Sequence, residues 1–201
     1  MLWAFRHFLF SHNAPGLFFK RLSLPDGPPT PETGGTGAEE FAISRIDRID
    51  GTFERRFNDV LAELDYAAPF TLSEADRRLG RGEQFIVACR GDAIAGWGWF
   101  AVDRVFCADF NCTIQIPRGQ AYAYNIFVSR RLRGRGLATR LLTAAEPCLA
   151  PLGVFANWAL IYDWNVASQK AFMKAGYERI GRYSILTVLG FRIRRCPELV
   201  Q

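Results

Sequence analysis

Hydrophobic residues recur at two different spacings along the chain, and each spacing predicts one type of secondary structure. Between residues 52 and 64 they recur every three or four positions, which predicts a helix with one apolar face. A second short helix is predicted to begin near Ser73, where Ser-Glu-Ala-Asp supplies an N-cap hydroxyl and early acidic side chains. Apolar runs predict strands at residues 41–46, 84–90, 93–102 and 121–128, with a hairpin turn at Gly91-Asp92.

The C-terminal half continues this alternation of helix and strand. A leucine-faced helix is expected after Gly136, and Pro147 should kink or end it, because proline lacks an N–H and clashes with the preceding turn. A further helix is predicted at residues 166–175 and is stopped by Gly176. Residues 103–120 are expected to be irregular, and strands are predicted at 154–162, 177–189 and 191–195. This order of elements predicts a single α/β (α+β) sheet domain.

The first 40 residues follow neither spacing. Residues 1–24 are aromatic and mildly basic, which suits either a membrane-surface anchor or a segment that docks on the domain. Docking is the better interpretation, because the apolar positions have no clean helical period. Residues 25–40 are rich in proline, glycine and threonine and are expected to form a linker or loop. The folded domain is therefore expected to span residues 41–201.

The composition is that of a globular protein and argues against several other classes. Of the 201 residues, 49% are hydrophobic and 22% charged, enough for one domain with a proper core. No apolar run reaches the ~18 residues of a membrane span. Five cysteines without a C-x-x-C pair, and only two histidines, argue against a disulfide framework and a metal site. We therefore expect a cytoplasmic protein with neither a bound metal nor an integral membrane segment.

Arginine supplies most of the net charge of +5, with clusters at residues 130–140 and 192–195. A nucleic-acid surface would use such charge, but the arginines form no stripe interleaved with exposed aromatic residues, so no nucleic-acid partner is expected. A cleft for a phosphorylated cofactor would use the same charge, as would a solvated basic face.

Residues 124–142 (YNIFVSRRLRGRGLATRLL) combine a buried strand, a turn with two glycines and a leucine-faced helix. The first N–H groups of a helix have no internal partner, and the helix dipole places positive charge there. Gly134 and Gly136 let the backbone approach an anion, and Arg133 and Arg135 add charge. This combination suits a pyrophosphate, although an ordinary arginine-rich turn has the same glycine spacing. Thr139 stands where a Rossmann turn needs its third glycine, and no P-loop motif is present.

Two blocks of sequence resemble the GNAT superfamily of acyl-CoA N-acyltransferases. Residues 133–138 (RGRGLA) resemble its R/Q-x-x-G-x-G/A signature, and residues 165–177 (NVASQKAFMKAGY) resemble its Asn-x-x-(Ala/Ser) … Lys-x-Gly-aromatic segment. The resemblance covers roughly residues 41–195. It implies a GNAT-like fold, with a mixed, mostly antiparallel sheet, helices on both faces and a splayed cofactor cleft. It also implies acetyl-CoA, or another acyl-CoA, as co-substrate.

The resemblance assigns roles to particular residues of this chain. The strand ending at residues 126–128 would expose backbone groups to the pantetheine arm, and the amides of residues 133–138 would hold the pyrophosphate. Asn165 would lie near the pantetheine or the acyl group, although it also suits the N-cap of the last helix. The expected cofactor-binding residues are Ile126, Phe127, Val128, Arg133, Gly134, Arg135, Gly136, Leu137, Ala138, Thr139 and Asn165.

The implied mechanism is direct attack of an amine on the thioester, and here the sequence departs from the family. Many relatives have a tyrosine as general acid at the position of Phe172, so Tyr162 could substitute, or the thiolate could leave unaided, since a thiol has a pKa of about 8.5. The base is also uncertain: Asp163, Asp103 and Glu83 are candidates, each typical of a solvated loop charge, and a water relay is an alternative. The expected catalytic residues are Asn165, Tyr162 and Asp163.

The expected activity is transfer of an acetyl or other acyl group from acyl-CoA to a small-molecule primary amine, such as an amino sugar or amino acid derivative. Two alternatives stay open: a peptide or protein N-acetyltransferase, and a regulatory domain that binds acyl-CoA without turnover. The protein is expected to be a monomer or homodimer. Four tryptophans could line an acceptor pocket, although aromatic residues on strands usually belong to the core: Trp97, Trp99, Trp158 and Trp164.

Overall fold

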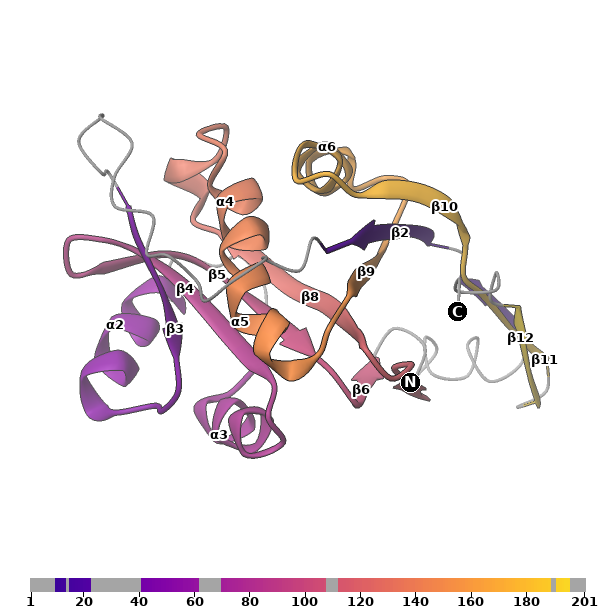
Figure 1. Ribbon diagram of the computed structural model, residues 1–201, viewed down its shortest axis with the longest axis horizontal. Helices are drawn as coiled ribbons and strands as arrows, with labels where there is room; N and C mark the ends of the chain where they lie inside the picture. The colour runs from indigo at the N-terminus through magenta and orange to yellow at the C-terminus, as the bar shows by residue number, and fades with distance from the viewer. Residues whose placement is uncertain are drawn as a thin grey trace.

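A seven-stranded sheet forms the centre of the computed structural model, which describes residues 10–13, 15–22, 41–61, 70–107, 112–188 and 191–195 (Figure 1). Its order from edge to edge is β10-β2-β9-β8-β5-β4-β3, and every pair of neighbours is antiparallel except β8 and β9. In chain order the strands are β2 (Gly16–Arg21), β3 (Ala42–Ile46), β4 (Gln84–Arg90), β5 (Ala93–Ala101), β8 (Gln120–Val128), β9 (Ala156–Ile161) and β10 (Glu178–Arg182).

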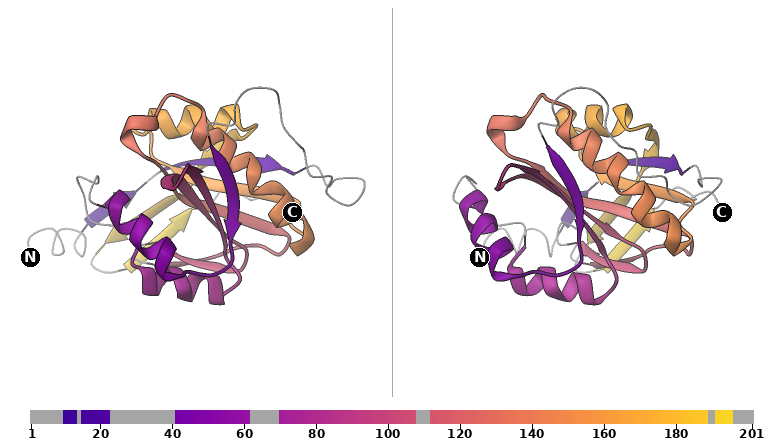
Figure 2. Two further views of the ribbon diagram at one scale, coloured as in Figure 1. Left: turned by 90° about the vertical axis from the view of Figure 1, so that its left-hand side faces the viewer. Right: turned by 60° about the vertical axis from the view of Figure 1, so that its left-hand side comes forward.

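Helices cover both faces of this sheet (Figures 1 and 2). On one face, leucines of α4 and Phe172 of α6 share a core cluster with Ile86, Phe100 and Ala123 of the strands. On the other face, the apolar sides of α2 and α3 pack against Trp97 and Trp99. The mixed, mostly antiparallel sheet expected from the sequence is thus confirmed. The helices are α2 (Gly51–Leu61), α3 (Leu72–Gly80), α4 (Leu137–Ala144), α5 (Glu146–Leu149) and α6 (Val166–Lys174), with short 3-10 turns η2 (Arg130–Leu132) and η3 (Ala150–Leu152).

Most predicted elements lie where the hydrophobic spacing placed them, and the break near Pro147 is also present. Helix α4 ends at Ala144, and Pro147 lies in the first turn of α5, where its missing N–H costs no helical hydrogen bond. The segment predicted as one strand over residues 177–189 is instead two strands in different sheets. Strand β11 (Ser184–Val188) leaves the main sheet and pairs with β1 (Phe10–Asn13) and β12 (Phe191–Arg195).

The expectation that residues 103–120 are irregular is wrong. Strands β6 (Arg104–Cys107) and β7 (Cys112–Gln115) pair with each other as an antiparallel two-stranded sheet. In β7 the buried residues Cys112 and Ile114 alternate with exposed ones, the period of a strand with one wet face. Each run holds only four residues, too few for the alternation to stand out in the sequence.

The N-terminal segment contributes strand β2 to the interior of the main sheet. This strand lies between β9 and β10 and pairs with both. Leu17 and Phe18 are buried on opposite faces of the sheet, because neither face of the apolar run GLFF carries a polar side chain that favours solvent. The sheet therefore begins before residue 41, the expected start of the domain. The expected linker at residues 25–40 lies outside the described residues.

Three of the four tryptophans belong to the core. Trp97, Trp99 and Trp158 are fully buried among strand and helix side chains, in line with the interpretation that strand aromatics fill the interior. Trp164, which follows β9, is instead 77% exposed and stacks on Tyr162 with a ring-centroid distance of 5.8 Å.

Candidate functional site

The parallel strands β8 and β9 pair only at their beginnings. Three residue pairs join them, from Gln120 with Ala156 to Tyr122 with Trp158, and the described pairing stops there. Past this point a cavity of about 190 Å³ lies between the diverging strands, closed on one side by Ser168 and Phe172 of α6. A ligand can therefore enter the sheet at the carboxyl ends of two parallel strands, the usual position of sites in open sheets that contain parallel strands.

A bulge in β8 borders this cavity. Against β5, Trp97 pairs with Phe127 and Trp99 with Tyr124, so Asn125 and Ile126 together oppose the single residue Gly98. Asn125 has a positive φ of 47°, and a bulge leaves backbone groups outside the regular ladder. Gly98 makes room for it, since a Cβ there would lie 2.7 Å from Ile126 Cδ1. The sequence analysis missed this bulge, although a glycine inside a strand is its signal.

The turn after β8 has the backbone geometry that the predicted anion cradle requires. Gly134 and Gly136 have φ of 81° and 74°, and Gly136 begins α4 without any side-chain cap. The N–H groups of the first turn of α4 are thus left for a ligand, at the positive end of the helix dipole. Buried Leu137 and Leu141 anchor the helix on the sheet.

A cavity of about 640 Å³ begins at this cradle and continues to the cavity between β8 and β9; Ile126, Asn165, Ser168 and Phe172 border both. Ten of the predicted cofactor-binding residues line it: Ile126, Phe127, Val128, Arg133, Gly134, Gly136, Leu137, Ala138, Thr139 and Asn165.

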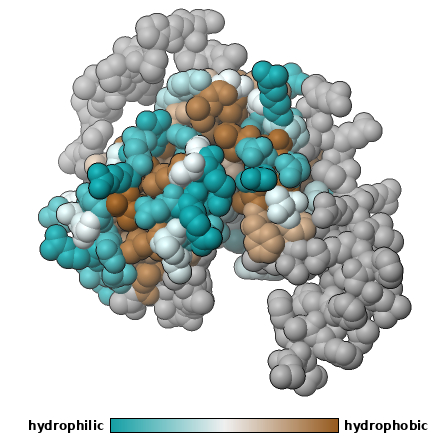
Figure 3. All heavy atoms as spheres, turned by 90° about the horizontal axis from the view of Figure 1, so that it is seen from below, coloured by the Kyte–Doolittle hydropathy of each residue, from teal (hydrophilic) through white to brown (hydrophobic). Residues whose placement is uncertain are grey.

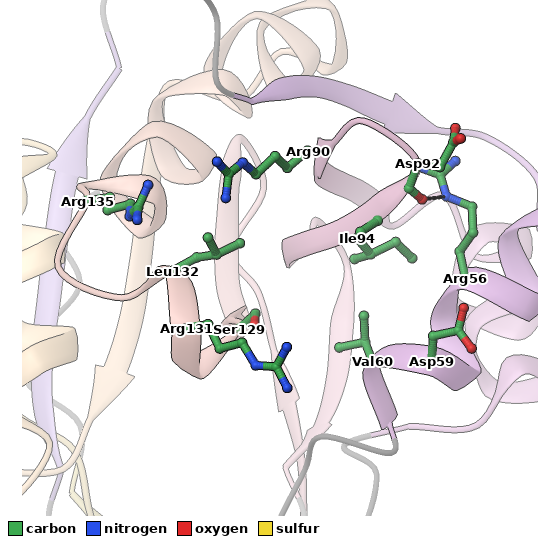
Figure 4. A pocket seen from close by; sticks show the side chains of 11 residues that line it. Arg56, Asp59, Val60, Arg90, Asp92, Ile94, Ser129, Arg131, Leu132 and Arg135 are labelled. Carbon is green, nitrogen blue, oxygen red and sulfur yellow. Dashed lines mark hydrogen bonds between the residues drawn. The ribbon is translucent and has the colours of Figure 1, made fainter.

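Arg135 faces a different cavity that borders the same loop (Figure 4). This cavity, of about 310 Å³, lies between α2, the turn after β4 and the loop after β8. In Figure 4 the side chains of Arg90 and Arg131 also point into it, while Arg56 donates to the carbonyl of Asp92. The glycine turn therefore has arginines in both neighbouring cavities: Arg133 in the larger one, and Arg90, Arg131 and Arg135 in this one.

Three of the predicted binding residues already have structural side-chain hydrogen bonds. Arg133 Nε donates to the carbonyl of Val128 at 3.3 Å. The Thr139 hydroxyl donates to the carbonyl of Ala171 at 3.2 Å and so ties α4 to α6. Asn165 Oδ1 accepts from the Ser168 N–H at 3.1 Å, which makes Asn165 the N-cap of α6. Because the Thr139 hydroxyl proton is already used, only the backbone N–H of Thr139 can donate to a phosphate. Asn165 both caps α6 and lines the cavity.

Helix α6 adds residues that the sequence analysis did not select. Lys170 and Lys174 lie one helical turn apart and line the large cavity together with Trp164, Ala167 and Ala171. Their spacing places two ammonium groups on the face of α6 that looks toward the cradle. The sequence shows this pair as Lys-x-x-x-Lys, a spacing that places both lysines on one helix face, where they could attract a negatively charged cofactor.

The candidate catalytic residues differ in their surroundings. Tyr162 lines the cavity between the diverging strands. Asp163 instead holds Arg179 at 2.7 Å and Arg182 at 2.5 Å, one with each carboxylate oxygen, and lines neither of the two connected cavities. Its carboxylate is thus engaged in ion pairs away from both cavities. Asp103 is exposed at the surface, as a solvated loop charge should be.

Glu83 is not the solvated loop charge that was expected; only 4% of it is exposed. Its carboxylate accepts hydrogen bonds from Arg81 Nη2 at 2.7 Å and from the Tyr124 hydroxyl. The expectation was wrong because residues 81–124 fold back on themselves, which no local pattern reveals. Burial raises the pKa of Tyr124 far above its usual range, and the Glu83 charge adds to this rise while Arg78 opposes it.

Tyr124 immediately precedes the bulge and lines the cavity between β8 and β9. Its ring also lies under the Arg78 guanidinium, 5.0 Å from the ring centroid. A phenol bonded to a buried carboxylate thus borders the cavity between β8 and β9, which Tyr162 also lines and Asp163 does not.

The geometry agrees with the comparison to known families. The model of the acetyltransferase (GNAT) family matches residues 48–177. The chain belongs to this family. The family is one of acetyltransferases, as the sequence motifs implied. Comparison with curated protein sequences finds no match.

Solved structures share the GNAT fold at low sequence identity. A GCN5-related N-acetyltransferase from Sphaerobacter thermophilus is 16% identical with a TM-score of 0.54, and its match covers 96% of this chain and 55% of the other. A GCN5-related N-acetyltransferase from Kribbella flavida is 11% identical with a TM-score of 0.51, and its match covers 92% of this chain and 62% of the other. AAC(6')-Iy, solved with a CoA-based bisubstrate analogue, is 18% identical with a TM-score of 0.53. Its match covers 69% of this chain and 90% of the other. The chain thus spans little more than half the length of the first two relatives.

Two further features bear on the ligands. Within the described residues no group of histidine, cysteine, aspartate and glutamate could hold a metal ion. No helix in the described part of the chain is long and apolar enough to cross a membrane.

Proposed function

We propose that the protein transfers an acetyl group from acetyl-CoA to the primary amine of a small molecule by direct attack. The observation that carries the proposal is the continuity between the glycine cradle and the cavity between β8 and β9. A cofactor with a pyrophosphate at one end and a thioester at the other would occupy both at once.

The cradle and α6 would hold the anionic end of acetyl-CoA. The free N–H groups at the start of α4 would bind the pyrophosphate, with Arg133 beside them. Lys170 and Lys174 would attract the remaining phosphate of the cofactor.

The pantetheine arm would run along the end of β8 to the bulge, where backbone groups are free of the ladder. A backbone N–H at the bulge would stabilise the oxyanion that forms when the amine attacks the thioester carbonyl. The new C–N bond forms, the C–S bond breaks, and CoA leaves as the thiolate, which water can protonate.

The amine proton would leave through Tyr124 and Glu83. Because the phenol donates to Glu83, its oxygen can accept the amine proton while its own proton passes to the carboxylate. This route supplies the general base; the general acid of other family members has no counterpart at Phe172, whose ring is buried against Phe18 and Tyr177, so the thiolate takes its proton from water.

Calorimetry with acetyl-CoA tests the cradle. In a Gly136→Asp variant, a carboxylate would face the pyrophosphate, so we expect binding to weaken roughly 100-fold or more. Gly153→Asp is the matched control, because Gly153 has nearly the same φ, 72°, and neither glycine has an atom within 4 Å of an added Cβ. Equal binding by both variants would refute the cradle. Release of free CoA thiol on a panel of amines then separates an enzyme from a domain that only binds acyl-CoA.

A further inference from the structure

A fourth cavity, of about 540 Å³, meets the site at Tyr124 from the face of the sheet that carries α3. Its walls come from α3 and from the β6–β7 hairpin, and Tyr124 borders both this cavity and the one between β8 and β9. In Figure 3, which looks from below, the described surface over α3 is largely hydrophilic. A molecule in this cavity would thus approach the bulge from the face opposite α4 and α6.

Arginine dominates the lining of this cavity. Arg77 and Arg78 of α3, Arg81 directly after α3 and Arg104 of β6 line it, against the single carboxylate of Glu74. Two other carboxylates lie near these arginines: Glu83 is buried and bonded to Arg81, and Asp103 lies 3.6 Å from Arg104 Nε.

With Arg81 engaged by Glu83, Arg77 and Arg78 share Glu74, at 2.7 and 3.3 Å. The Arg104 contact with Asp103 is longer than a hydrogen bond. The cavity therefore keeps an excess of positive charge at the positions that line it.

Arg78 supplies an independent observation. It is 9% exposed, its guanidinium lies over the rings of Phe70, Trp99 and Tyr124, and within the described residues nothing accepts a hydrogen bond from its Nη1. Glu74 accepts only from its Nε, so this buried guanidinium keeps a donor, Nη1, for a further anion.

We infer that this cavity binds the acceptor, and that the acceptor is an amine that also carries an anionic group, a carboxylate or a phosphate. The inference rests on the proposed acetyl transfer and names its substrate class. The anion would lie among Arg77, Arg78 and Arg104, and the amine would reach Tyr124. Arginine binds both anions through paired N–H groups, whereas an acceptor with several positive charges is repelled.

Matched pairs of amines test the substrate class. One arm compares amino carboxylates with their amides, and the other compares amino-alcohol and amino-sugar phosphates with their unphosphorylated forms, all by release of CoA thiol. We expect the anionic member of at least one arm to show a kcat/KM roughly tenfold or more above its neutral partner, since one charged hydrogen bond contributes about that factor. The arm with the larger ratio identifies the anion, and the ratio should fall at high salt.

A variant links this preference to the cavity. Arg77→Gln with Arg104→Gln should lower kcat/KM roughly tenfold for the anionic amine and leave the neutral amine and the binding of acetyl-CoA unchanged. Arg45→Gln is the control, because Arg45 is also exposed and also pairs with an acid, Asp47 at 2.8 Å, but lies on β3 away from the cavity.

A preference for neutral amines, or an equal loss in the Arg45→Gln control, would overturn the inference and leave acetyl transfer standing. Loss of the preference in Arg90→Gln with Arg131→Gln would move the acceptor to the cavity of Figure 4 and overturn it as well. Calorimetry on the CoA-loaded protein compares the binding affinities of the two amines of each pair without turnover. Failure of wild type to bind acetyl-CoA would instead refute the proposed function itself.

Discussion

At the scale of single residues, the proposed reaction passes the amine proton through the Tyr124 phenol. It donates to buried Glu83, and burial keeps its pKa far above neutral pH, so it passes a proton on only as it receives one. We expect Tyr124→Phe to lower kcat roughly 100-fold, the usual contribution of a positioned acid or base, without changing the affinity for acetyl-CoA. Tyr122→Phe is the control, since Tyr122 stacks on Tyr124 on the same strand but lines neither cofactor cavity.

The same phenol makes stability depend on alkaline pH. Its pKa is about 10 in the unfolded chain and higher in the folded protein, so below pH 10 both states keep the proton. Above about pH 10 the unfolded state ionises first, and the free energy of unfolding falls as pH rises. Urea unfolding should show a shallower fall for Tyr124→Phe than for wild type. The fall should not vanish, because burial raises the pKa of Tyr177 too. Identical slopes would mean that Tyr124 is not protonated as proposed.

At the scale of elements, Gly98 of β5 leaves room for the Ile126 side chain of the bulge in β8. An added Cβ at Gly98 would lie 2.7 Å from Ile126 Cδ1, so Gly98→Ala should displace the bulge. We expect acetyl-CoA to bind several-fold more weakly and the protein to lose about 1–3 kcal/mol of stability, as in an overpacked core.

The contact of the added Cβ with one methyl group, Ile126 Cδ1, allows a specific control. Replacing isoleucine by valine removes Cδ1, so Gly98→Ala with Ile126→Val should regain most of the affinity that Gly98→Ala loses. Ile126→Val alone measures the cost of the smaller side chain. If the double variant binds no better than Gly98→Ala, the bulge does not depend on this contact.

At the scale of the whole molecule, local patterns in the sequence predict local structure well. The strand predicted at residues 84–90 matches β4, and the glycine turn with its helix lies as the motif indicated, since each depends on neighbours in sequence. The pair of Glu83 and Tyr124 joins residues 41 positions apart, and the bulge depends on two strands together. Neither leaves a periodic signal, so the sequence offered Glu83 only as one of three candidate bases and gave no sign of its contact with Tyr124.

Strand β2 is another such long-range feature, and it lies before residue 41, where the sequence predicts the domain to begin. It pairs with β9 and β10 at once, and Phe18, 1% exposed, packs near Phe172 of α6. We therefore expect Phe18→Ala to cost about 3–5 kcal/mol, as for a buried phenylalanine. Exposed Phe106 is the control, with a change within about 0.5 kcal/mol.

Amide hydrogen exchange would show how far the effect of β2 extends. Because β2 bridges β9 and β10, Phe18→Ala should speed exchange in β9, β10 and α6, which share its hydrogen bonds and core, more than in β3 and β4 at the other edge. A uniform change would mean that the sheet opens as one cooperative unit. A cost below about 1 kcal/mol, with exchange unaltered, would mean that β2 only docks on a domain that starts at residue 41, since a peripheral strand contributes little to the core. The N-terminal segment would then matter little to the cofactor site that β9 and α6 help to build.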